Sequence, residues 1–200
     1  MIIKSFEILK KVSNYLNYNL FLLYGENLGL KKEIKDKIKI LLNEKDSEIE
    51  TLSFYENDII NNEEIFYNSI FSGSLFSSKK IITISNVTDK LMKQLEDVID
   101  KFPKNIYLVI FSEVLEKKSK LRNFFEKNTK TVCVPCYSDS ERDLQYIAIS
   151  ELKKNNIILS RESINLLIEK SNGDRNNLRN EIDKIKSFSL NNKKLEIDEI

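Results

Sequence analysis

Five short apolar runs, separated by amphipathic helical stretches, limit the possible folds of this chain more than any other feature. The runs lie at Leu20–Tyr24, Ile49–Tyr55, Lys80–Ser85, Ile106–Phe111 and Thr131–Pro135. Continuous rather than alternating apolar runs are typical of strands that are buried on both faces of a parallel sheet. We therefore expect an α/β domain in which a five-stranded parallel sheet carries helices on both faces.

Beyond the last of these runs the pattern changes, and three helices are predicted in place of strands. Ser138–Glu141 offers a capped start for the first helix, while Ser160 and Asp174 can cap the other two. Helices of this length cannot each bury an apolar stripe alone, so we expect them to pack together. The predicted domains are residues 1–138 for the α/β domain and 139–200 for a small three-helix domain.

Composition removes several classes of function. The 200 residues include no His, which excludes histidine bases, Ser-His-Asp and Cys-His nucleophiles, and most zinc sites. The 32 basic residues nearly balance 31 acidic ones, so a protein that coats nucleic acid is not indicated. Neither a secretory signal nor an apolar run of membrane-spanning length is present, and we expect a cytoplasmic protein.

The turn after the first apolar run has the position of a phosphate-binding loop but not its residues. Such a loop needs Gly-x-x-x-x-Gly-Lys-Ser/Thr between a strand and a helix. Gly25 and Lys31, which opens the predicted helix, match this pattern, whereas Leu30 takes the place of the second glycine despite the nearby Gly29. Lys32 stands where a hydroxyl would hold magnesium, and its ammonium repels the metal instead. An ordinary turn is the competing interpretation.

A second part of a nucleotide site is also incomplete. The most apolar run, Ile106–Phe111, is followed by Ser112 and Glu113, so the aspartate that would organise a metal is absent. The altered phosphate loop and the missing aspartate both indicate loss of nucleotide hydrolysis. A nucleotide-hydrolysing scaffold that has lost hydrolysis is predicted, with no catalytic residue, no bound metal and no cofactor.

Three other segments could carry function. Gly73-Ser74-Leu75-Phe76 places two large apolar side chains in a small polar loop, where they either await a partner or fold back into the sheet edge. Lys117, Lys118, Lys120 and Arg122 could contact DNA phosphate or form a solvated helix face. Cys133 and Cys136 have neither further zinc ligands nor the helix start of a redox pair, which favours structural thiols.

Taken together, these segments resemble the delta subunit family of the bacterial DNA polymerase III clamp loader, an ATPase-inactive branch of the AAA+ superfamily. The residues that carry the resemblance are Leu22–Glu26, Ser74–Lys80, Lys118–Arg122, Gly173-Asp174, Leu178 and Glu181–Ile185. Their order and spacing extend over the whole chain. The resemblance implies a P-loop sheet of the AAA+ or RecA-like type, a degenerate phosphate loop and a three-helix lid.

The resemblance also implies a function. Delta subunits bind the sliding clamp, the beta subunit, and hold its ring open for loading onto primed DNA, while the gamma/tau subunits hydrolyse ATP and delta-prime completes the assembly. The clamp-binding element would present Leu75 and Phe76, flanked by Gly73 and Ser74, to a pocket on the clamp. Some members carry Met where this chain has Gly73, so one anchor contact is absent. The family's helical collar is missing after Ile200, which suggests that the chain is a fragment.

Two alternatives remain open at this point. The chain could be an ATP-hydrolysing AAA+ or P-loop protein with a divergent loop, in which case it would turn over magnesium-ATP. It could also be a plain DNA-binding adaptor that uses the basic segment, in which case it would bind DNA strongly and in a salt-dependent way.

Overall fold

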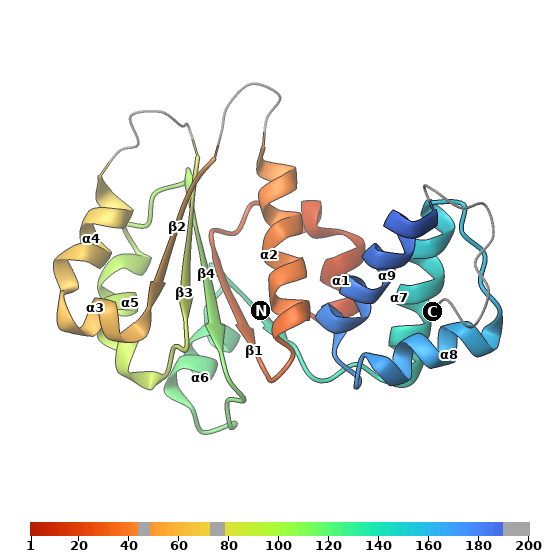
Figure 1. Cartoon of the computed structure of the whole chain (residues 1–200). Coiled ribbons are helices and arrows are strands. Elements are labelled where there is room, and N and C mark those ends of the chain that lie inside the picture. Colours follow the sequence, from red (N-terminus) through yellow and green to blue (C-terminus); the bar gives the residue numbers. More distant parts are fainter. Residues whose placement is uncertain (44–48, 73–78, 190–200) are drawn as a thin grey trace. The chain divides into compact units, whose positions relative to one another are not determined.

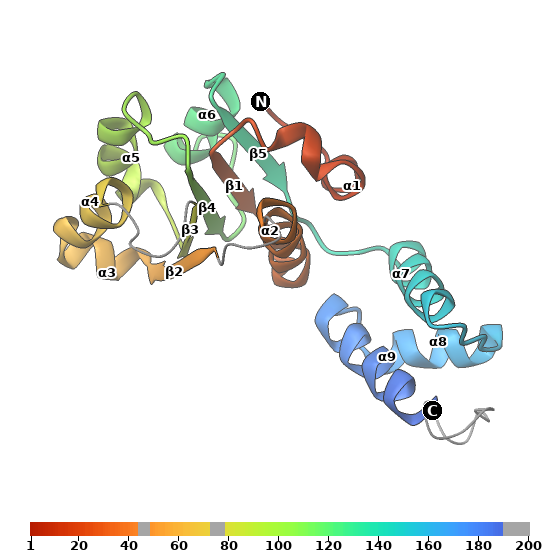
Figure 2. The same cartoon turned by 90° about the horizontal axis from the view of Figure 1, so that it is seen from above.

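Five parallel strands form one sheet in the computed structural model, which describes residues 1–43, 49–72 and 79–189. The strands are β1 (Leu20–Tyr24), β2 (Glu50–Tyr55), β3 (Lys80–Ser85), β4 (Ile106–Ser112) and β5 (Thr131–Pro135). Their order is β2-β3-β4-β1-β5, so the first strand lies between the last two (Figure 1, Figure 2). The predicted parallel sheet is confirmed.

Helices cover both faces of this sheet, as the sequence predicts. They are α1 (Ser5–Lys10), α2 (Leu28–Leu42), α3 (Glu56–Asn61), α4 (Glu63–Phe71), α5 (Met92–Ile99) and α6 (Lys120–Lys127), with short 3₁₀ turns at Val12–Tyr15 (η1) and Asp89–Leu91 (η2). Helices α3 to α6 share one hydrophobic core with the sheet, and α1 and α2 share the other (Figure 2). Because side chains alternate along a strand, successive residues of β1 and β4 pack into the two cores in turn.

The sequence pattern is least informative at the edge of the sheet and at short helices. Strand β2 pairs only with β3 in the described sheet, and its residues alternate between half-buried and exposed instead of forming a buried run. Helices α1 and α3 are absent from the sequence prediction because each buries very few apolar side chains. Helix α6 begins at Lys120 because the Ser119 side chain caps it by accepting from the Arg122 amide.

The chain forms two compact units, Met1–Tyr137 and Ser138–Ile200. The second unit contains α7 (Glu141–Lys154), α8 (Arg161–Lys170) and α9 (Arg175–Ser189). Their apolar faces form a separate core that includes Leu144, Leu167 and Leu178. Helix α8 ends at Lys170, and Gly173, at a φ of +72°, lies in the turn that follows it.

A buried ion pair joins two parts of this helical unit. The Arg175 guanidinium, at the start of α9, donates two hydrogen bonds to the Asp139 carboxylate, which precedes α7. Both side chains are almost completely buried. A buried charge that loses its partner is strongly unfavourable, so this pair constrains the way α9 packs beside α7.

Among the described residues, no helix is both long enough and apolar enough to cross a bilayer.

The ion pair predicts a marked difference between two substitutions in this unit. Arg175→Met removes the guanidinium from the buried Asp139 carboxylate, and should destabilise the helical unit by about 3–5 kcal/mol. Lys154→Ala removes an exposed partner of Glu151 and should change stability by less than about 1 kcal/mol. Amide hydrogen exchange of α7 and α9 measures both effects. Equal exchange rates in the two variants would show that the buried pair does not hold the unit together.

Candidate functional site

The predicted phosphate loop is a tight turn between β1 and α2. Strand β1 ends at Tyr24 and α2 begins at Leu28, so the connection consists of residues 25–27 alone. Helix α2 thus begins before Lys31, which corrects the prediction that Lys31 opens it. Asn27 caps the helix by accepting a hydrogen bond from the Leu30 amide at 2.9 Å. This turn leaves little backbone to wrap around a phosphate group.

The hydrogen-bond donors of this turn bond to carbonyl oxygens at the ends of β4 and β5. The Gly25 amide donates to the carbonyls of Ser112 and Glu113, both at 3.2 Å. Asn27 donates through its backbone amide to the Cys136 carbonyl at 3.0 Å and through Nδ2 to the Tyr137 carbonyl at 3.1 Å. A phosphate loop works because its amides face an anion. Here the Gly25 and Asn27 amides face the protein's own carbonyl oxygens.

Gly25 lies unusually close to the end of β5. Its φ of +127° is in a region that residues with a side chain rarely adopt, and a Cβ at this position would lie 2.2 Å from the Cys136 carbonyl oxygen. Glycine is therefore required here by a close approach within the protein. No ligand needs to be invoked for it.

Lys31 is turned into the protein. Its side chain is 5% exposed, and Nζ donates to the carbonyls of Gly25 at 2.7 Å and Ser112 at 2.9 Å. Burial lowers the pKa of this ammonium, while nearby acidic groups, including Glu113 and Glu26, oppose the shift. In a working phosphate loop the corresponding lysine reaches the β- and γ-phosphates. In this protein the Lys31 ammonium bonds instead to carbonyls at the ends of β1 and β4.

The other residues of the predicted loop do not converge on a ligand position. Leu30 belongs to the core between α2 and the sheet, and Gly29 is buried beside it, whereas Lys32 is exposed. The Ser112 hydroxyl donates to the Val87 carbonyl at 2.6 Å. Within the described ranges, no cluster of three or more Cys, Asp or Glu side chains could hold a metal ion.

A group of aromatic and charged side chains that the sequence analysis missed lies at the end of β1. Tyr24 is buried, with the Arg122 guanidinium 5.0 Å from its ring centroid and the Tyr137 ring packed edge-on at 6.1 Å. Burial, followed by a hydrogen bond with Tyr137, raises the pKa of Tyr24 far above its ordinary value. This cluster and the Asn27 bond hold Tyr137, the last residue of the first unit, beside the turn.

Arg122, a predicted DNA contact, makes several bonds inside the protein. Its Nε donates to Glu126 at 2.6 Å and its terminal nitrogen donates to the Leu115 carbonyl at 3.0 Å. The bond with Glu126 raises the pKa of the guanidinium. The i,i+4 spacing of Arg122 and Glu126 was the sequence signal for this pair.

Lys117, Lys118 and Lys120 are exposed, and Lys118 forms an ion pair with Glu116 at 2.9 Å. The nearby start of α6 is occupied by the Asp89 carboxylate, which accepts from the Ser119 hydroxyl and from the Lys120 and Leu121 amides. Burial by itself would raise the pKa of the Asp89 carboxyl, but these hydrogen bonds outweigh burial and lower the pKa below its ordinary value. Any anion bound here must therefore contact lysine side chains and not this helix terminus.

The two cysteines are free and buried, and they lie in different cores on opposite faces of the sheet. Burial raises the pKa of the Cys133 thiol to about 12, which disfavours a reactive thiolate. These observations agree with structural thiols.

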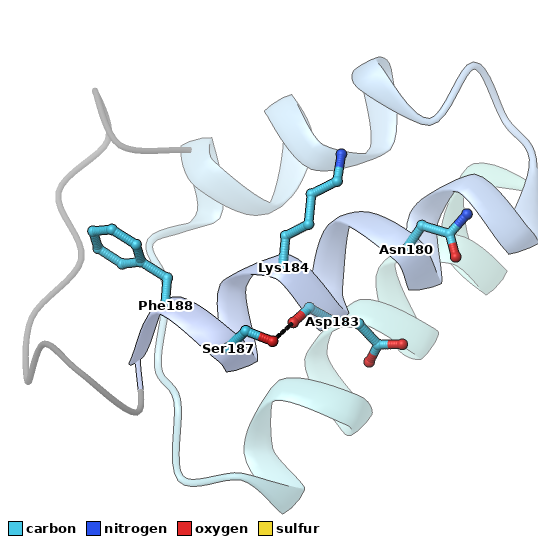
Figure 3. Close-up of a pocket in the computed structure, with 5 residues that line it drawn as sticks. All are labelled: Asn180, Asp183, Lys184, Ser187 and Phe188. Carbon is cyan, nitrogen blue, oxygen red and sulfur yellow. Dashed lines mark hydrogen bonds between the residues drawn. The ribbon is translucent and has the colours of Figure 1, made fainter.

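A shallow hollow on α9 offers no alternative site. Its lining comes from one helix: Asn180, Asp183, Lys184, Ser187 and Phe188 (Figure 3). The Ser187 hydroxyl donates to the Asp183 carbonyl at 2.9 Å, and the Asp183 carboxylate accepts from Lys186 at 2.9 Å. Polar groups that already bond within their own helix do not converge on a substrate.

The predicted clamp-binding residues Gly73, Ser74, Leu75 and Phe76 lie outside the described residues. Their position therefore stays a prediction. Helix α4 before them and strand β3 after them are both described.

Comparison with known families connects this geometry to DNA replication. A family model described as "DNA polymerase III, delta subunit" matches residues 21–137. A protein of Rickettsia prowazekii (strain Madrid E), called "Probable DNA polymerase III subunit delta", is 29% identical over 168 residues. The match covers 84% of this chain and 50% of that protein, so the chain spans about half the length of this relative.

Solved structures share the fold. The Bacillus subtilis DNA clamp loader delta protein has a TM-score of 0.64 and 16% identity, over 98% of this chain and 60% of that one. AMPPCP-bound DnaA from Aquifex aeolicus has a TM-score of 0.57 and 16% identity, over 91% of this chain and 60% of that one. The sheet and helices therefore have the AAA+ fold.

The close approach at Gly25 predicts a contrast between two glycines. Gly25→Ala must displace the Cys136 carbonyl and adopt a strained φ, so it should destabilise the sheet by about 3 kcal/mol or more. Gly173→Ala, at a φ of +72° with open space around the position, should destabilise the helical unit by only about 1 kcal/mol. Amide exchange in β1 and in α9, respectively, measures the two losses. A Gly25→Ala loss no larger than that of Gly173→Ala would contradict the packing described here.

Proposed function

The chain belongs to the DNA polymerase III delta subunit family, and we propose that it binds the sliding clamp and holds the ring open without hydrolysing ATP. Its proposed partners are the beta clamp, the gamma/tau and delta-prime subunits, and primed DNA reached through the assembled loader. The proposed location is the bacterial cytoplasm. Each of these statements concerns the whole protein. This chain covers only 50% of the Rickettsia relative and 60% of the Bacillus subtilis delta protein.

The observation that carries the proposal is the bonding of Lys31 to the Gly25 and Ser112 carbonyls. The AAA+ fold normally uses this position to hold nucleotide phosphates, and here the lysine faces the protein interior. Lys32 supplies no hydroxyl for magnesium, and Ser112 supplies no carboxylate at the end of β4. A member of this fold without these groups is suited to act by binding.

Binding alone is sufficient to open a ring. A protein that binds the open clamp more tightly than the closed clamp shifts the equilibrium by the difference between the two affinities. Leu75 and Phe76 are the proposed anchors, because two adjacent large apolar side chains can fill a small pocket and form a hot spot. No covalent step is required of this subunit.

A contact with DNA is a separate part of the proposal. Lys117, Lys118 and Lys120 are exposed and could contact phosphates in the assembled loader. Arg122 is less suited to this role because its guanidinium already bonds to Glu126 and Leu115.

The proposal predicts that clamp binding depends on the two anchors. Leu75→Ala and Phe76→Ala should each weaken binding to the cognate sliding clamp by about 30-fold or more, since truncating a hot-spot residue costs about 2 kcal/mol or more. Surface plasmon resonance with immobilised clamp measures the affinities of the single and double variants.

Leu41→Ala and Phe6→Ala form the matched control. They remove the same side-chain types from other surface positions, where Leu41 is 48% exposed and Phe6 is 53% exposed. These variants should bind the clamp as tightly as the unaltered chain. Equal affinity of the anchor and control variants would refute the assignment of Leu75 and Phe76, and absence of any clamp binding would refute the proposed function.

A further inference from the structure

A groove on the surface of the first unit lies between the end of α1 and the second half of α2, which are neighbours on one face of the sheet (Figure 2). It has a volume of about 280 Å³, near the small end of the range for ligand sites, about 300–1,000 Å³. Its lining combines lysine and apolar side chains from residues 9–13 with others from residues 37–41. A groove of this size suits the side chains of a peptide better than a whole cofactor.

The apolar part of the groove is only partly covered by the protein itself. Leu9 and Val12 pack against the core beneath α1. Ile40 and Leu41, by contrast, are 70% and 48% exposed. Large apolar side chains that remain exposed beside a groove are typical of a surface that a partner covers.

Two lysines at the rim of the groove have no acidic partner among the described residues. Lys10 ends α1 and Lys11 follows it, and both are exposed. No carboxylate in the described part of the chain forms an ion pair with either ammonium. The Lys10 ammonium lies 5.7 Å from the centre of the Phe6 ring, a contact that uses none of its N–H donors. Both ammonium groups can therefore bond to an anionic partner.

A third lysine, on α2, joins the two sides of the groove. Lys37 Nζ donates to the Leu9 carbonyl at 3.1 Å and lies 3.4 Å from the Glu33 carboxylate, one turn earlier on α2. The carbonyls in the last turn of a helix have no partner within the helix, so this bond also completes the end of α1. Lys37 thus shapes the groove, whereas Lys10 and Lys11 provide its charge.

The surface around the groove is basic although the whole chain is nearly neutral. Residues 1–43 contain eight lysines and four acidic residues, whereas residues 49–72 contain five acidic residues and neither Lys nor Arg. An anionic partner is therefore attracted to the part of the unit that contains α1 and α2, and a cationic partner is repelled.

We propose that this groove docks an acidic peptide segment of a partner protein. Apolar side chains of the peptide contact Ile40 and Leu41. Its carboxylates pair with Lys10 and Lys11, which gives the apolar centre and polar rim of a protein interface. A single strand of DNA fits less well, because its bases stack on aromatic rings and none of the described lining residues is aromatic. The inference does not depend on clamp binding.

The probe is a fluorescein-labelled peptide of sequence Glu-Asp-Leu-Leu-Asp-Glu, and fluorescence anisotropy measures its affinity for the unaltered chain. Replacing the acidic residues of the peptide by lysine, or its leucines by serine, should weaken binding about tenfold or more, because both charge pairing and apolar contact are required. Binding should also weaken as salt is added, since the ion pairs at the rim are exposed to solvent.

Charge reversal on the protein tests the rim. Lys10→Glu/Lys11→Glu should weaken peptide binding about tenfold or more, because two attractive pairs become repulsive. Lys101→Glu/Lys104→Glu is the matched control, since it makes the same change at two exposed lysines of the same unit that follow α5. The control should keep its affinity within about threefold, because salt screens charges that lie away from the groove.

Leu41→Ala tests the apolar part of the groove. It removes apolar area that the peptide covers, and should weaken peptide binding about fivefold. Thermal unfolding of this variant and of both charge-reversal variants, followed by circular dichroism, shows that each is folded at the temperature of the binding measurement.

A selective loss in the Lys10→Glu/Lys11→Glu variant and in Leu41→Ala would establish the docking site. Equal affinity of the two charge-reversal variants, equal affinity for the acidic and lysine peptides, or no binding at about 1 mM acidic peptide would overturn it. A dimer of the unaltered chain in sedimentation velocity that Leu41→Ala dissociates would assign the groove to a second copy of this chain, and would also overturn the proposal.

Discussion

The bonds from the Lys31 ammonium to the carbonyls of Gly25 and Ser112 are the constraint on which the rest of this site depends. A buried ammonium must be hydrogen-bonded, and these two oxygens lie where β1 and β4 end. Removal of the ammonium would take one donor from each carbonyl and leave the Ser112 carbonyl with the Gly25 amide. The same interaction that stabilises the centre of the sheet therefore directs the lysine away from any bound phosphate.

Other contacts at this edge reinforce that arrangement. Gly25 fits only without a side chain against Cys136, and Asn27 bonds to the two residues that end the first unit. Tyr24, beneath Arg122, packs against Tyr137. A turn that could have faced a nucleotide is instead packed against the segment that leads to the helical unit. The AAA+ fold is retained, and Leu30 and Lys32 stand where a phosphate loop has glycine and a hydroxyl residue.

Residue types predicted the architecture well, because burial leaves a direct pattern in the sequence. The continuous apolar runs of β1 and β4 indicated a parallel sheet, which the structure contains. The directions of long polar side chains could not be predicted in this way. Lys31 and Lys80 each bond to a carbonyl that is distant in sequence or belongs to another element, and no local pattern reveals such a partner. The contact of Arg122 with Tyr24 could not be predicted for the same reason, because it forms only when β1 and α6 come together.

The most direct test of the central claim is the release of inorganic phosphate from magnesium-ATP by the purified chain, compared with its Lys31→Met variant. If Lys31 serves only to bond the strand ends, neither protein should release phosphate above the buffer background. Release by the unaltered chain that disappears in Lys31→Met would show that this lysine still acts on nucleotide, and would contradict the account.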